Sequence, residues 1–229
     1  MFGRFISVSL FAILVMLTGC ATRTKMAFES DDGKLTEKSK PVFLMTATIK
    51  NTYKTSWQPK LKVVNVEKAN AKDATDRLNF TMDEKAKAES DDPAIGSNYF
   101  LRLELDPGNY EIVGMSSLAS TFPINAFFFA PLHAGITVGE PGVYYLGHVN
   151  ATVRERQGDE FKAGPSIPLI DQAIAGASGG TFEIEVIDDF VKDEALFRSK
   201  FNALAGVKIT KALLPTFDRA KAQAWWQAH

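Results

Sequence analysis

The stretch LRLELDPGNYEI, residues 101–112, decides the fold class. Three leucines alternate with charged residues before the turn Asp106-Pro107-Gly108-Asn109, and Tyr110 and Ile112 flank Glu111 after it. Alternation with a period of two is typical of half-buried strands, and proline followed by glycine suits a type II-like turn. The pattern therefore predicts two antiparallel strands joined as a hairpin.

Further segments with the composition of strands lie on both sides of this stretch. They are rich in β-branched and aromatic residues and end at polar or turn residues. The expected strands cover residues 42–49, 60–66, 78–82, 143–154 and 181–187. Many short strands separated by turns predict a mainly β protein, an antiparallel β-sandwich.

Two C-terminal helices are expected to pack on this sandwich. Asp188 or Asp189 can cap the first helix, and its apolar side chains fall along one stripe. This stripe contains Phe190, Phe197, Phe201 and Leu204. The second helix is expected from Phe217 to about Gln227.

The N-terminus has the pattern of a cleaved signal. Arg4 precedes an apolar run from Phe5 to Leu17, which is too short for a permanent membrane span of about 20 residues. Leu17-Thr18-Gly19-Cys20 follows and resembles the lipobox of bacterial lipoproteins. The resemblance implies cleavage before Cys20, a diacylglycerol on its sulfur, and acylation of the new amino terminus.

This resemblance predicts a location and a division of the chain. Residues 1–19 are expected to be a cleaved signal peptide, 20–40 the lipidated cysteine and a flexible tether, 41–188 the sandwich, and 189–229 a helical extension. In enteric lipoproteins an Asp after the cysteine favours the inner membrane, whereas this chain has Ala21. The expected address is thus the periplasmic face of the outer membrane of a Gram-negative bacterium, with the inner membrane or cell surface as alternatives.

The composition excludes some functions. Residues 1–19 contain one cation and no acid, so cleavage lowers the formal charge from −1 to −2. A nucleic-acid-binding domain normally carries a net positive charge, so nucleic acid is not an expected partner. Cys20 is the only cysteine, which excludes an intramolecular disulfide and, once it is lipidated, a thiol nucleophile.

A second resemblance concerns residues 95–155. Leu103-x-Leu105-x-Pro107-Gly108-x-Tyr110 and Gly142-x-Tyr144-Tyr145-Leu146-Gly147 are similar to motifs of uncharacterised envelope lipoproteins. These contain small β-sandwich domains of the transthyretin-like or carboxypeptidase-regulatory kind. The resemblance implies a fold and brings no catalytic residues.

Two aromatic groups are candidates for a partner or ligand surface. Phe127, Phe128 and Phe129 lie between two prolines, which limits this segment to an edge strand or a loop. Buried, they would belong to the core; exposed, they would bind a partner, lipid or ligand. Trp225 and Trp226 are adjacent on the last helix, so one of the two is expected to face a rim, membrane or partner.

Polar candidates follow one face of the strand 143–154. His148, Asn150, Thr152 and Arg154 alternate with apolar residues, which predicts a solvated row able to hold a polar ligand. The three histidines, His133, His148 and His229, lack metal-ligand spacing, so no metal or other cofactor is expected. No hydrolase motif is present, and only an acid beside His148 in a cleft would favour an enzyme.

The sequence thus favours a non-catalytic binding or structural module, anchored by lipid in the periplasm. Its expected partners are the membrane and an envelope protein, peptidoglycan or a polysaccharide. One alternative is a carrier or chaperone for an apolar ligand or lipid, which an enclosed cavity at residues 127–129 would favour. The other is an unrecognised hydrolase.

Overall fold

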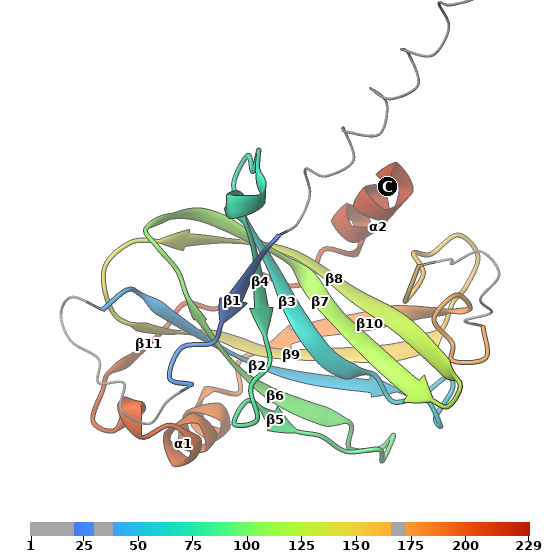
Figure 1. Ribbon diagram of the computed structural model, residues 1–229, viewed down its shortest axis with the longest axis horizontal. Coiled ribbons are helices and arrows are strands. Elements are labelled where there is room, and N and C mark those ends of the chain that lie inside the picture. Colours follow the sequence, from blue (N-terminus) through green and yellow to red (C-terminus); the bar gives the residue numbers. More distant parts are fainter. Residues whose placement is uncertain (1–20, 30–38, 166–172) are drawn as a thin grey trace, which may run out of the picture.

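The structure is a computed structural model that describes residues 21–29, 39–165 and 173–229. Two packed β-sheets form its body (Figure 1), which confirms the mainly β sandwich with C-terminal helices. Cys20 and its cleavage motif Leu17-Thr18-Gly19 lie outside the described residues.

The first sheet, sheet A, has five strands in the order β1-β4-β3-β7-β8. Their bounds are β1 Thr22–Lys25, β4 Arg77–Thr81, β3 Lys60–Lys68, β7 Gly108–Thr121 and β8 Ile124–Val138. β8 is an edge strand and contains Pro131, as expected for a proline within a sheet.

The second sheet, sheet B, has the order β10-β9-β2-β6-β5, and β11 also pairs with β9. Its strands are β10 Gly180–Ile187, β9 Val143–Glu155, β2 Val42–Asn51, β6 Ser97–Glu104, β5 Lys87–Ala88 and β11 Ile209–Lys211. The short strand β5 lies within the charged, alanine-rich residues 83–93. β9 pairs in parallel with β2 and with β11.

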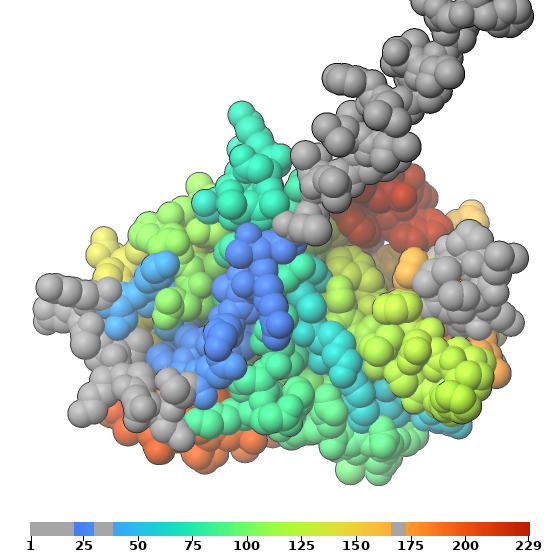
Figure 2. Space-filling view, in the orientation of Figure 1, coloured from blue at the N-terminus to red at the C-terminus, as the bar shows by residue number. Residues whose placement is uncertain are grey.

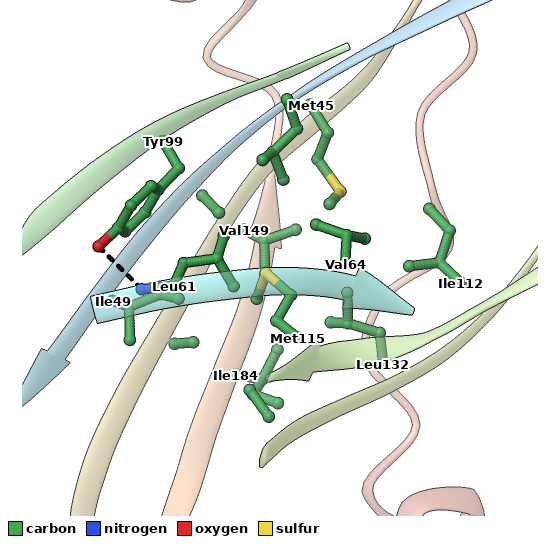
Figure 3. Packing of buried hydrophobic residues seen from close by; sticks show 14 of the residues in the cluster. Met45, Ile49, Leu61, Val64, Tyr99, Ile112, Met115, Leu132, Val149 and Ile184 are labelled. Carbon is green, nitrogen blue, oxygen red and sulfur yellow. Dashed lines mark hydrogen bonds between the residues drawn. The ribbon is translucent and has the colours of Figure 1, made fainter. Parts of the chain in front are cut away.

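The main core lies between the sheets, and its apolar side chains come from alternate positions of both. Figure 3 shows Leu61 and Val64 of β3 among Met45, Tyr99 and Val149 of sheet B. The Tyr99 hydroxyl accepts a hydrogen bond from Leu61 N at 2.9 Å, which joins the two sheets across the core.

The helices occupy separate parts of the molecule (Figure 1). α1, Phe190–Lys200, covers a second apolar cluster on the outer face of sheet B that includes Phe100, Tyr145 and Phe197. α2, Arg219–Ala228, contacts β8. Short 3₁₀ turns lie at Ala74–Asp76 and Asn202–Leu204. No helix in the described ranges is both long and apolar enough to span a membrane.

The predicted hairpin is wrong. β6 and β7 flank the Pro-Gly turn, but they belong to different sheets, so the chain passes from sheet B to sheet A at this turn. Gly108 begins β7 with φ +150°, a value that L side chains rarely adopt. Leu103 and Ile112 both belong to the main core, although they come from different sheets. Alternation indicates which side chains of a strand are buried, but it does not indicate the sheet to which the strand belongs.

Two of the predicted segments contain strands that the sequence does not indicate. Within the expected tether, β1 pairs in parallel with β4, and the blue segment that contains it lies against the rest of the molecule (Figure 2). Met26 and Ala27, which follow β1, are buried. This segment folds because Met26 joins the main core and Ala27 joins the second one. Within the expected helical extension, β11 adds a strand to sheet B.

Candidate functional site

An aromatic cluster lies where α2 meets β8. The indole of Trp225 has its ring centroid 5.5 Å from that of Phe129, 4.9 Å from that of His133 and 4.8 Å from that of His229. Trp225 and Trp226 are both half-buried, and Trp226 packs against the main core. The structure therefore joins Phe129 with Trp225, two of the aromatic candidates predicted from sequence.

Polar contacts hold α2 in this position. Asp218 caps the helix by accepting a hydrogen bond from Lys221 N at 2.9 Å. Lys221 Nζ donates to His133 O at 2.7 Å and pairs with Glu111 Oε2 at 3.2 Å. Gln223 Oε1 accepts from Phe161 N at 2.6 Å. The start of α2 is thus tied both to sheet A and to the loop after β9.

Glu111 connects β7 with β8 and α2. Its Oε1 lies 2.7 Å from His133 Nδ1, and its Oε2 pairs with Lys221. Partial burial alone would raise the pKa of Glu111, but the hydrogen bonds from His133 and Lys221 outweigh it and lower the pKa below its usual value. His133 has φ +50°, next to a register shift between β7 and β8.

A recess of about 520 Å³ opens beside this cluster at the α2 side of the molecule, where α2 lies at the surface (Figure 2). Its volume falls within the range of small-molecule sites. The residues that line it are Phe129, Lys162, Gly164, Pro165, Trp225, Trp226 and His229. The side chains of this lining are mostly aromatic or apolar, and they include one lysine and one histidine but no aspartate or glutamate.

The other two phenylalanines of the predicted surface have different positions. Phe127 is 49% exposed, whereas Phe128 is buried and lies edge-on to Phe182 in the core. Phe128 points inward because successive side chains of a strand alternate between its faces. Of the two alternatives for this segment, Phe128 therefore follows the core one, and it is not part of a partner surface.

The polar residues predicted along one face of β9 have different environments in the structure. Asn150 is half-buried on the outer face of sheet B, and Arg154 forms ion pairs with Glu160 at 2.6 Å and Glu183 at 2.9 Å. Hydrogen bonds from Arg154 lower the pKa of Glu160 to about 2. Arg154 is therefore already paired by neighbouring acids, which explains it as a structural residue.

His148 is buried, and its predicted solvated position is wrong. Its Nδ1 lies 3.2 Å from Asp193 Oδ1 of α1, and its Nε2 lies 2.7 Å from Thr48 Oγ1 of β2. The Tyr145 hydroxyl donates to Asp193 Oδ2 at 2.7 Å. α1 covers this part of sheet B, so a position that the strand pattern leaves to solvent is enclosed.

Burial alone would raise the pKa of Asp193, but hydrogen bonds from His148 and Tyr145 outweigh it and lower the pKa below its usual value. A small recess of about 280 Å³ adjoins the group, and its lining includes Asn98, His148 and Asp193. An acid thus lies beside His148 in a recess, which is the arrangement that would favour an enzyme.

Thr48, His148 and Asp193 follow the order hydroxyl, imidazole, carboxylate found in nucleophilic hydrolases. In those enzymes the hydroxyl donates its hydrogen to the imidazole. Here Thr48 Oγ1 donates its single hydrogen to Asn98 Oδ1 at 2.6 Å. The imidazole therefore does not receive it, and the geometry does not favour Thr48 as a nucleophile.

Sequence reasoning missed Thr48, His133 and Asp193. Thr48 and Asp193 are 145 positions apart and meet only because α1 folds over β2 and β9. The Asp189-to-Asp193 spacing of four residues could have indicated one shared helix face. Nothing local to His133 indicates its contacts with Glu111 and Trp225.

Comparisons with protein-family models, curated proteins and solved structures found no match to this chain. The described part of the chain offers two candidate sites, the recess beside α2 and the polar group under α1.

Proposed function

We propose that this protein is a non-catalytic binding module of the bacterial envelope, held at a membrane by lipid on Cys20. The recess beside α2 receives an apolar group of the ligand. The observation that carries this proposal is the aromatic lining by Phe129, Trp225 and Trp226 of a site with ligand-sized volume.

The chemistry of the lining limits the ligand. Aromatic side chains bury large apolar areas, and indole adds a hydrogen-bond donor at its edge. Lys162 and His229 are the titratable side chains of the lining, and neither is an acid. The recess therefore suits an apolar group that is neutral or negatively charged, offered by an envelope protein, peptidoglycan, a polysaccharide or a lipid.

The shape of the site supports capture at the surface. A carrier would enclose its apolar ligand in the core, but the Phe128 side chain fills the core at this position. The recess lies outside that core, between α2 and the segment 162–165. A surface recess lets a ligand remain attached to a larger envelope component while one group binds.

Location is the second part of the proposal. The lipobox Leu17-Thr18-Gly19-Cys20 supports lipidation, and Ala21 supports the periplasmic face of the outer membrane. Two or three acyl chains give stable attachment, since each buried methylene contributes about 0.8 kcal/mol.

Binding can be tested with dodecanoate as a simple apolar anion. A Cys20→Ser chain without residues 1–19 avoids detergent, and isothermal titration calorimetry measures the affinity. We expect saturable binding of dodecanoate, weaker binding of dodecylammonium, and at least tenfold loss of dodecanoate affinity in Trp226→Ala.

Phe122→Ala is the matched control. Phe122 is 98% exposed at the turn between β7 and β8 and is not part of the recess, so its loss should leave the affinity unchanged. Equal affinities of the Trp226→Ala and Phe122→Ala variants would refute the assignment of the recess.

A further inference from the structure

A buried imidazole and a buried carboxylate lie side by side where α1 meets sheet B. His148 Nδ1 lies 3.2 Å from Asp193 Oδ1, and His148 Nε2 lies 2.7 Å from Thr48 Oγ1. The Asp193 side chain is fully buried, and that of His148 is 6% exposed. Imidazole nitrogen and carboxylate oxygen are both metal-ligand atoms, and the fold holds them next to each other away from solvent.

Asp189 adds a third donor atom to this pair. It is the N-cap residue of α1, yet its side chain makes no capping hydrogen bond, the usual role of aspartate at this position. Its carboxylate instead lies with the Asp193 carboxylate and the His148 ring, with one ligand atom from each within 4.8 Å of the others. The spacing of four residues puts both aspartates on one face of the helix.

The only ion pair of Asp189 in the described part of the chain is with Lys192 at 3.3 Å. The Lys192 side chain is 64% exposed. An exposed pair of this kind contributes little free energy, so it leaves the Asp189 carboxylate available to a more strongly bound cation.

The groups around these three residues hold them in place. Thr48 fixes the plane of the imidazole, and Tyr145 binds the second oxygen of Asp193. The Thr46 hydroxyl is buried beside Asp193, lines the same recess and makes no well-aligned hydrogen bond. Metal ligands in proteins normally have such supporting partners, which set their orientation.

We propose that His148, Asp189 and Asp193 bind one divalent transition-metal ion at the junction of α1 and sheet B. One imidazole and two carboxylates suit Zn²⁺ or Mn²⁺. Three protein ligands leave at least one coordination position for water or a ligand atom. The site is separate from the recess beside α2, so it can exist whether or not that recess binds an apolar group.

Isothermal titration calorimetry with Zn²⁺ tests the proposal. The untagged, full mature chain is first treated with a chelator, and Zn²⁺ is then titrated into it. We expect one equivalent to bind, and the affinity to fall at least tenfold in Asp189→Asn. Asp188→Asn is the matched control: Asp188 is the adjacent acid, pairs with Lys211 at 2.7 Å and is not part of the cluster. It should bind Zn²⁺ as the unchanged chain does.

His148→Gln and His229→Gln form a second matched pair, because a surface histidine could also capture Zn²⁺. We expect loss of binding in the first variant only, with circular dichroism showing that both remain folded. No saturable binding by the unchanged chain, or equal affinities of the Asp189→Asn and Asp188→Asn variants, would overturn the proposal. Asp189 is only partly buried, so that comparison stands even if His148→Gln fails to fold.

Discussion

At the scale of the residue, Arg102 shows what local pattern cannot reveal. It alternates with leucines, which predicts a solvated side chain, yet its side chain is fully buried. Its guanidinium donates to Ala27 O at 2.7 Å and to Phe100 O at 2.8 Å, pairs with Asp83 and lies over the ring of Phe201. Ala27, Asp83 and Phe201 come from distant segments, so residues 101–105 alone do not indicate these partners.

Arg102→Ala should lower the free energy of unfolding by about 3–5 kcal/mol, because it leaves Asp83 and two carbonyl oxygens without their donor. Urea-induced unfolding followed by circular dichroism measures the change. Lys62→Ala, at an exposed position of β3, should change it by no more than about 0.5 kcal/mol. Similar losses in both variants would contradict this account of Arg102.

Glu160 should make the free energy of unfolding depend on pH in the acidic range. Hydrogen bonds from Arg154 lower its pKa from 4.5 to about 2, so its contribution is complete above pH 4.5 and is lost as the pH falls toward 2. Glu160→Gln should therefore destabilise the protein by roughly 1–2 kcal/mol at pH 7.

The difference between Glu160→Gln and the unchanged chain should shrink between pH 4.5 and pH 2 in urea-unfolding curves. Glu185→Gln serves as the control, since Glu185 is exposed on β10. A difference that stays constant over this range would argue against the ion pairs of Glu160.

At the scale of the element, strands could be predicted but their partners could not. β2, β3, β9 and β10 form close to the predicted ranges, because alternation and β-branched residues report local burial. The turn after β6 has the composition of a hairpin and joins two sheets instead. Pairing depends on contacts between distant segments, which neither composition nor periodicity records.

For the candidate sites, too, individual residues could be predicted but their contact partners could not. The aromatic residues of α2 could be singled out because they are adjacent tryptophans on one short helix. Their meeting with Phe129, and the enclosure of His148 by α1, depend on how the helices pack on the sheets. The sequence therefore indicates some residues of each site, but it does not predict which residues contact one another in either site.

The close contact of β7 and β8 gives a prediction about an element. A Cβ on Gly114 would lie 2.6 Å from Ala130 O and 2.6 Å from Phe129 Cζ. Gly114→Ala should therefore destabilise the protein by about 1–3 kcal/mol through displacement of β8. Gly139→Ala is the control, since no atom lies within 4 Å of its Cβ position. Equal melting temperatures of the two variants would contradict the close strand packing.

At the scale of the whole molecule, the fold begins almost at the proposed anchor. β1 starts at Thr22, two residues after Cys20. Two extended residues span at most about 7 Å, so a lipid on Cys20 would hold the sandwich close to the membrane surface. This differs from the long tether predicted from the composition of residues 20–40.

Cys20→Ser should release the protein from membranes, because the acyl chains proposed on this cysteine would supply the binding free energy. Fractionation of cells into membrane and soluble parts measures the release, and metabolic labelling with palmitate measures lipidation. Continued labelling of the Cys20→Ser protein would contradict the proposed anchor.

Photo-crosslinking in intact cells tests whether the recess beside α2 binds an envelope component. A photoreactive phenylalanine replaces Trp226 in one strain and Val191, 82% exposed on α1, in the control strain. We expect a discrete adduct from position 226 and none from position 191, and mass spectrometry then identifies the adduct as protein, glycan or lipid. Identical background labelling from both positions would show that the recess does not bind an envelope component.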